Sequence, residues 1–239
     1  MKNNNEKLFR VSPSKIGNLL ECPRCLWLFY REGLARPEGI FPSLPSGMDG
    51  IFKEYFDKYR NTNKLPPEVA GKIEGKLFKD IDKLKMWRSR NKGLQAEFPE
   101  FNIFLKGLID DLLVTSDADF IEHPRRSRDN KYIPLDFKSR GYPIKEDTHS
   151  HYQHQLDLYA LLFEKNNLPP ANFGYLLFFY PINYNEGIAK FSTELVKMDV
   201  SPKRGYGILR KVHQIITGKQ PLSHSECKYC QYRNFQLND

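Results

Sequence analysis

The stretch of sequence that decides the fold is YIPLDFKSR, residues 132–140. Its apolar residues recur with a period of two, which predicts a β-strand. One face of this strand is apolar and consists of Ile133, Leu135 and Phe137. Asp136 and Lys138 lie on the opposite face, so a carboxylate and an ammonium project from the same side. We therefore expect a chemically active strand inside a larger sheet.

An acid-x-Lys tripeptide is weak evidence by itself, because it also occurs at residues 74–76, 129–131 and 226–228. Only the copy at 136–138 lies within an apolar strand, which would hold both groups rigidly. Context therefore selects Asp136 and Lys138 as candidate catalytic residues.

A second acidic motif precedes this strand. The sequence KGLIDDLLV, residues 106–114, places Asp110 and Asp111 after an apolar run, and Gly107 permits a bulge or a close backbone approach. We expect one of these aspartates to face the same side as Asp136. Two carboxylates beside a lysine would bind Mg²⁺ or Mn²⁺ and activate water for in-line attack on phosphate. The alternative is an acid pair exposed in a β-turn.

The remaining pattern predicts an α/β fold with a central mixed sheet flanked by helices. Strand-like runs continue from residue 94 as a meander, and two further strands follow near 173 and 190. Helices are expected to begin near Ser12, after Gly47 and at Ser201, and over 148–165. The helix that begins at Ser201 is expected to stop at Gly218.

The helix predicted over 148–165 carries Gln155 and Tyr159 on one face, four residues apart. They would hydrogen-bond the lysine, a water or a phosphate; the alternative is a plain polar edge on an amphipathic helix. Histidines crowd the start of this helix at positions 149, 151 and 154. Their spacing lacks the i, i+4 pair of a helical zinc site, so we do not expect them to bind metal.

All four cysteines fall into two C-x-x-C pairs at opposite ends of the chain, Cys22 with Cys25 and Cys227 with Cys230. In a cytosolic protein, this spacing indicates tetrahedral zinc or an iron–sulfur cluster more than disulfides. The pairs would meet in a small lobe that joins the termini, formed by residues of about 12–35 and 219–235.

Charge and hydropathy narrow the class of protein. Thirty-seven Lys and Arg against 29 Asp and Glu give a net charge of +8, which favours polyanionic partners such as nucleic acids. The basic run at 124–131 would follow a DNA backbone or form a solvated hairpin loop. The sequence contains no long apolar segment and no secretory signal, so we expect a cytoplasmic protein without membrane contact.

The order of these motifs resembles the PD-(D/E)xK nuclease superfamily, and within it the RecB-type branch that includes cysteine-bearing CRISPR-adaptation exonucleases and the AddB nuclease domain. The likeness extends from about residue 12 to 230 and is carried by Asp49, Gly107, Asp110, Asp136, Phe137, Lys138, Gln155, Tyr159 and the bracketing cysteines. It implies a restriction-endonuclease-like core, with residues 1–239 forming a single nuclease domain. It further implies an exonuclease-like DNA hydrolase acting on single strands or ends, with a helicase, CRISPR or repair protein as partner.

Carried over to this chain, the resemblance makes Asp110, Asp136 and the Phe137 carbonyl ligands of Mg²⁺ or Mn²⁺. Lys138 positions or activates the water, and Gln155 and Tyr159 match the glutamine–tyrosine motif of the branch. Glu97 stands where the family often has an acid, and its role is open.

The chain departs from the family pattern twice. Asp49 stands where the family usually supplies a metal-binding histidine, and it would bind the same metal. Relatives with a 4Fe–4S cluster usually have one early and three late cysteines, whereas this chain has two and two. The resemblance favours 4Fe–4S, with Zn²⁺ as the alternative. Two rival functions remain, an inactive nucleic-acid-binding protein of the same fold and a zinc-stapled structural module.

Overall fold

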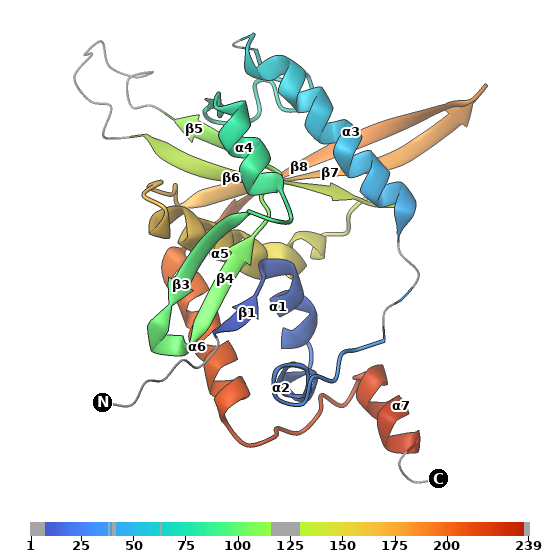
Figure 1. The fold of residues 1–239 in the computed structure, drawn as a ribbon. Helices are drawn as coiled ribbons and strands as arrows, with labels where there is room; N and C mark the ends of the chain where they lie inside the picture. Colours follow the sequence, from blue (N-terminus) through green and yellow to red (C-terminus); the bar gives the residue numbers. More distant parts are fainter. Residues whose placement is uncertain (1–7, 38, 40–41, 63, 116–129, 237–239) are drawn as a thin grey trace.

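The computed structural model describes residues 8–37, 39, 42–62, 64–115 and 130–236. It contains two β-sheets and the helices that cover them, in a mixed α/β arrangement that confirms the predicted fold class (Figure 1). The basic run at 124–131 lies largely outside the described residues.

The larger sheet has the strand order β2-β5-β6-β7-β8. Its strands are β2 (Lys76–Leu77), β5 (Asp111–Thr115), β6 (Lys131–Ser139), β7 (Phe173–Asn185) and β8 (Ile188–Asp199). β6 pairs antiparallel with β5 and parallel with β7, so the predicted decisive strand lies at the centre of a mixed sheet. The parallel pair needs a crossover, which helix α5 (Gln153–Lys165) provides.

A smaller sheet has the order β1-β4-β3, formed by β1 (Phe9–Val11), β4 (Ile103–Gly107) and β3 (Leu94–Phe98). The meander predicted from residue 94 is therefore wrong, because β3 and β4 belong to this sheet and β5 and β6 to the other. The chain passes between the sheets at Leu108, Ile109 and Asp110. A continuous apolar run hides such a crossing, because buried apolar residues continue from β4 through Ile109 into β5.

Helices cover both faces of the larger sheet. The helices and 3₁₀ turns are α1 (Pro13–Leu20), α2 (Pro23–Arg31), α3 (Ser43–Arg60), α4 (Ile81–Arg88), η1 (Pro99–Phe101), η3 (Thr148–Tyr152), α5, α6 (Pro202–Thr217) and α7 (Lys228–Gln236). The predicted helix starts at Pro13 and Pro202 are confirmed. The helix predicted over 148–165 begins with a 3₁₀ turn and becomes α-helical at Gln153.

Two hydrophobic clusters lie on opposite faces of β6. The apolar face of this strand, Ile133, Leu135 and Phe137, packs with Phe52 and Phe56 of α3. The other cluster joins α5 and α6 to α1, α2 and the smaller sheet. Because strand residues alternate, Asp136 and Lys138 face α5, as the period of two predicts.

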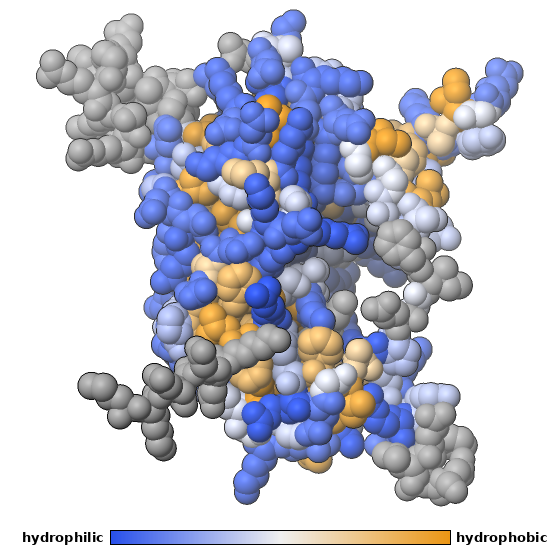
Figure 2. Space-filling view, viewed as in Figure 1, coloured by the Kyte–Doolittle hydropathy of each residue, from blue (hydrophilic) through white to orange (hydrophobic). Residues whose placement is uncertain are grey.

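The surface is hydrophilic over most of α3 and α4, whereas hydrophobic residues show over the β3–β4 hairpin (Figure 2). Within the described part of the chain, each helix is too short or too polar to cross a lipid bilayer. The extent of a single nuclease domain over residues 1–239, with the two segments 12–35 and 219–235 as its lobe, stays a prediction.

Candidate active site

Asp110 and Asp136 lie next to each other at the point where the chain enters the larger sheet. Asp110 precedes β5, and its Oδ2 accepts a hydrogen bond of 2.9 Å from the backbone N–H of Phe137. This bond ties the loop before β5 to the middle of β6, one residue from Asp136. The side chain of Asp136 is almost fully buried, with 2% of it exposed. The structure therefore brings together the two carboxylates that the sequence proposed as a pair.

Lys138 and Gln155 complete a closed set of contacts around Asp136. The Lys138 ammonium pairs with Oδ2 of Asp136 and donates to Oε1 of Gln155 at 3.0 Å. The Gln155 amide donates to Oδ1 of Asp136 at 3.1 Å and to the Tyr159 hydroxyl at 2.8 Å. Gln155 thus contacts the lysine, as the sequence predicted, and also holds the carboxylate.

Tyr159 joins the side chains around Asp136 to the end of β4 in the smaller sheet. Its hydroxyl donates to the carbonyl of Leu108 at 2.7 Å, and its ring lies over Gly107. A Cβ at Gly107 would stand 2.7 Å from Leu162 and 3.1 Å from the tyrosine ring, so only glycine fits without a shift. The glycine of the motif serves this close approach.

Asp111 differs from its neighbour Asp110 in both direction and partners. Its two carboxylate oxygens bind the guanidinium of Arg60 at 2.6 and 3.1 Å, and Arg88 adds a contact at 3.4 Å. Asp57 pairs with both arginines. Asp111 is therefore held in a buried ion network between α3, α4 and β5, and Asp110 is the aspartate that faces Asp136.

Among the described residues, Asp49 is joined to the site through a lysine, Lys53. Both residues are on α3: Lys53 pairs with Asp49 at 2.6 Å and with Oδ1 of Asp110 at 2.8 Å. The sequence reasoning missed Lys53. The i, i+4 spacing from Asp49 was the available signal, because it predicts a salt bridge on one helix face. The ammonium thus stands between the two carboxylates that were proposed to share a metal.

Burial and the two lysines set the protonation of the carboxylates. Burial opposes ionisation of Asp110, but the positive charges of Lys53 and Lys138 outweigh it and lower the pKa. For Asp136, burial dominates; Lys138 favours ionisation and Asp110 opposes it, and the pKa rises to about 7. Burial would lower the pKa of Lys138, yet Asp136 and Asp110 raise it. Lys138 is consequently a charged donor in this arrangement.

The donor set suits a hard divalent cation. Oδ2 of Asp136 is buried, and the Lys138 ammonium lies against it. Carboxylate oxygens are the ligands that Mg²⁺ and Mn²⁺ prefer. Asp110 and Asp136 therefore fit such an ion, and the Phe137 carbonyl stays a proposed third ligand.

Other candidate residues lie apart from this set. Glu97 is exposed on β3, and no described hydrogen bond or ion pair joins it to Asp110 or Asp136. His154 packs against Gly17 of α1, and its pKa is lowered, first of all by burial. Among the described residues, the cysteines are the group of three or more donors that converges on one point.

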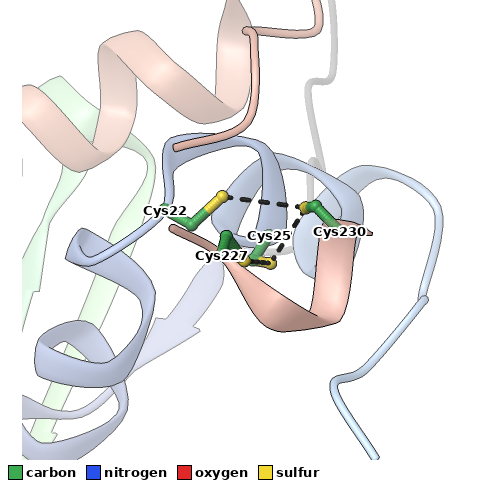
Figure 3. A group of neighbouring side chains, drawn as sticks. All are labelled: Cys22, Cys25, Cys227 and Cys230. Carbon is green, nitrogen blue, oxygen red and sulfur yellow. Dashed lines mark hydrogen bonds between the residues drawn. The ribbon is translucent and has the colours of Figure 1, made fainter. Parts of the chain in front are cut away.

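The four cysteines form a compact cluster that joins the two ends of the chain (Figure 3). Cys22 precedes α2 and Cys25 lies within it; in the same way, Cys227 precedes α7 and Cys230 lies within it. The Sγ atoms are 3.8 Å apart for Cys22 and Cys230, and 3.6 Å for Cys25 with Cys227 and with Cys230. All four are free thiols whose sulfurs lie within 4.8 Å of one another, so they could bind a metal.

The fold and these two sites define a class, a mixed α/β protein with a two-carboxylate-and-lysine centre of the kind that metal-dependent nucleases use. The model of the PD-(D/E)XK nuclease superfamily matches residues 10–235. A search of the curated proteins found no match. The chain belongs to the PD-(D/E)XK nuclease superfamily, whose members are generally hydrolases of nucleic acids that use divalent metals.

Proposed function

We propose that the protein is a Mg²⁺- or Mn²⁺-dependent deoxyribonuclease that hydrolyses phosphodiester bonds at Asp110, Asp136 and Lys138. The observation that carries this proposal is the convergence of Asp110, from the loop before β5, with Asp136 and Lys138 of β6 around one buried carboxylate. The exonuclease-like character is proposed from the resemblance to the RecB-type branch.

The side chains divide the chemistry among themselves. Asp110 and Asp136 would hold the divalent ion, which when bound supplies positive charge to the phosphate and lowers the pKa of the attacking water. Lys138 keeps its proton, so it orients the water and stabilises the negative charge that develops on the phosphate. Gln155 holds both Asp136 and Lys138 in place, and Tyr159 anchors Gln155 to Leu108.

Lys53 favours a second candidate function, a nucleic-acid-binding protein without turnover. Its ammonium takes one oxygen of Asp110 and the carboxylate of Asp49, where the family has a metal-binding histidine. A cation fixed at that point competes with a divalent ion for Asp110. Turnover separates the two functions.

The cysteine cluster is proposed to hold a structural metal that joins the termini. A zinc ion with bonds of about 2.3 Å to four thiolates places the sulfurs about 3.8 Å apart. In a 4Fe–4S cluster each thiolate binds a different iron, so the sulfurs stand farther apart. Three of the sulfur–sulfur distances are 3.6–3.8 Å and all lie within 4.8 Å, so they support the zinc alternative over the iron–sulfur centre that the resemblance favours.

A cleavage assay with a matched control tests the nuclease. End-labelled single-stranded DNA, duplex DNA and RNA are incubated with Mg²⁺ or Mn²⁺ and with wild type, Asp136→Asn or Glu74→Gln. Glu74 begins another acid-x-Lys tripeptide but is exposed and pairs only with Lys197 among the described residues. Wild type and Glu74→Gln should cleave DNA, and Asp136→Asn should not.

Binding of Mn²⁺, measured by calorimetry, gives a second readout. It should weaken in Asp136→Asn and stay unchanged in Glu74→Gln. A product ladder from one end would identify an exonuclease. Undiminished cleavage by Asp136→Asn would refute the site. Absence of cleavage by wild type that retains its structural metal would support the non-catalytic candidate.

A further inference from the structure

A basic groove opens beside the candidate active site. It has a volume of about 460 Å³ and is lined by residues of β1, the start of α1, the end of β4 and the loop after α4. Its lining includes Arg10, Lys15, Arg90 and Lys106 and contains no acidic residue. A larger cavity of about 680 Å³ is lined in part by Glu164 and touches none of the proposed catalytic residues.

The alternation of side chains along β4 explains which residues line the bottom of this groove. In β4, Ile103, Leu105 and Gly107 are buried, so Phe104 and Lys106 project from the opposite face. β1 pairs with β4 in parallel, with Arg10 beside Phe104. In Figure 1, β1, β4 and α1 lie side by side with α5 behind them.

Local contacts hold the positive charges in position. The Arg10 guanidinium lies 5.1 Å from the centre of the Phe104 ring, and Tyr30 donates to the Arg10 carbonyl at 2.9 Å. The Lys106 ammonium donates to the carbonyl of Arg90. In the part of the chain that the structure describes, no carboxylate forms an ion pair with Arg10, Arg90 or Lys106. These cations need counter-charges from a ligand or from solvent ions.

The groove shares a wall with the active site. Leu108 and Tyr159 line it, and they are joined by the hydrogen bond from the tyrosine hydroxyl. Tyr159 in turn accepts from Gln155, which contacts Asp136 and Lys138. A polyanion in the groove would therefore contact the wall that Leu108 and Tyr159 form beside the proposed catalytic residues.

We propose that this groove binds the backbone of a single nucleic-acid strand and leads it to the active site. The inference rests on the proposed function for its substrate. Single strands are bound by basic grooves that follow the phosphates and include aromatic side chains, which matches a lining that contains Phe104 and these three cations. The volume is that of a pocket for a small ligand, which is enough for nucleotides of one strand.

The test measures binding directly, in buffer stripped of free Mg²⁺ and Mn²⁺ so that turnover does not interfere. The anisotropy of a fluorescein-labelled oligothymidylate is titrated at several salt concentrations. The groove variant is Arg10→Gln with Arg90→Gln and Lys106→Gln. The control variant, Lys203→Gln with Lys211→Gln and Lys219→Gln, removes the same charge from exposed positions outside the groove.

Three phosphate contacts contribute about 2 to the slope of log K against log salt for single strands, so the groove variant should lose about that much slope. At about 0.1 M salt this corresponds to roughly 100-fold weaker binding, with little change in the control variant. Arg90→Gln alone, which leaves the carbonyl acceptor of Lys106 intact, should lose about 0.7 of the slope and keeps the test valid if the triple variant does not fold.

Equal binding by groove and control variants, or no binding by wild type, would overturn the proposal. Equal affinity of wild type for duplex of the same sequence would overturn the single-strand assignment, and so would displacement of the oligonucleotide by polyglutamate at equal charge. If wild type cleaves DNA but the groove variant binds the oligonucleotide as tightly as wild type, the proposed nuclease function is kept and the proposed role of the groove is refuted. If binding depends on the groove residues but wild type does not cleave, the groove proposal is kept and the nuclease function is refuted.

Discussion

Replacing Asp111 by asparagine is expected to destabilise the protein far more than the same change at Asp110. The variant removes one of the two carboxylates that both Arg60, whose side chain is 1% exposed, and Arg88 contact, and it leaves them Asp57. Breaking a buried ion pair by removing one partner costs about 3–5 kcal/mol. For a chain of this size that corresponds to a fall in Tm of roughly 6–20 °C.

Asp110→Asn should have little effect on Tm but a large effect on cleavage. It removes a carboxylate that opposes ionisation of Asp136, and Lys53 keeps Asp49 as a partner. We expect a Tm within a few degrees of wild type and a loss of cleavage of at least about 10²-fold. Asp110 and Asp111 are adjacent, so a difference between the two variants reflects only the direction in which each side chain points and the residues that it contacts.

The assay is thermal unfolding of metal-free variants together with DNA cleavage in Mg²⁺. Glu74→Gln, which breaks an exposed ion pair with Lys197, is the control and should lower stability by about 1 kcal/mol or less. The reasoning would be refuted if Asp111→Asn unfolded at the wild-type temperature, or if Asp110→Asn cleaved DNA at the wild-type rate.

Three further outcomes are expected. Lys53→Met should bind Mn²⁺ more tightly by calorimetry, because Asp110 loses a competing positive charge; weaker binding would show that the ammonium supports the metal. Gly107→Ala should lower the free energy of unfolding by about 1–3 kcal/mol and reduce cleavage, because its Cβ would push against Leu162 and Tyr159; an unchanged denaturation midpoint would contradict the close approach. Purified protein should contain one zinc per chain by elemental analysis and no visible absorption, and removal of the metal should lower Tm; a brown protein with four irons would identify the cluster instead.

Much of the fold followed from local pattern. The period of two in residues 132–140 identified β6 and its two faces, since alternation in a strand separates a buried face from a reactive one. The Ser201 cap and the proline at the first helical position, Pro13, predicted the helix starts, because both signals act through the first turn only. Signals of this range are contained in a few neighbouring residues.

The sequence by itself determined the identity of the acid, lysine, glutamine and cysteine candidates, because their types and spacings are local. Tertiary structure shows that Asp110 is the aspartate that faces Asp136, which the resemblance implied but local periodicity could not, since the chain changes sheets at that point. It also decided that Lys53 stands between Asp49 and Asp110, and that three cations from separate segments share one groove. Contacts between residues far apart in sequence depend on how the sheets pack, and that packing is a property of the whole chain.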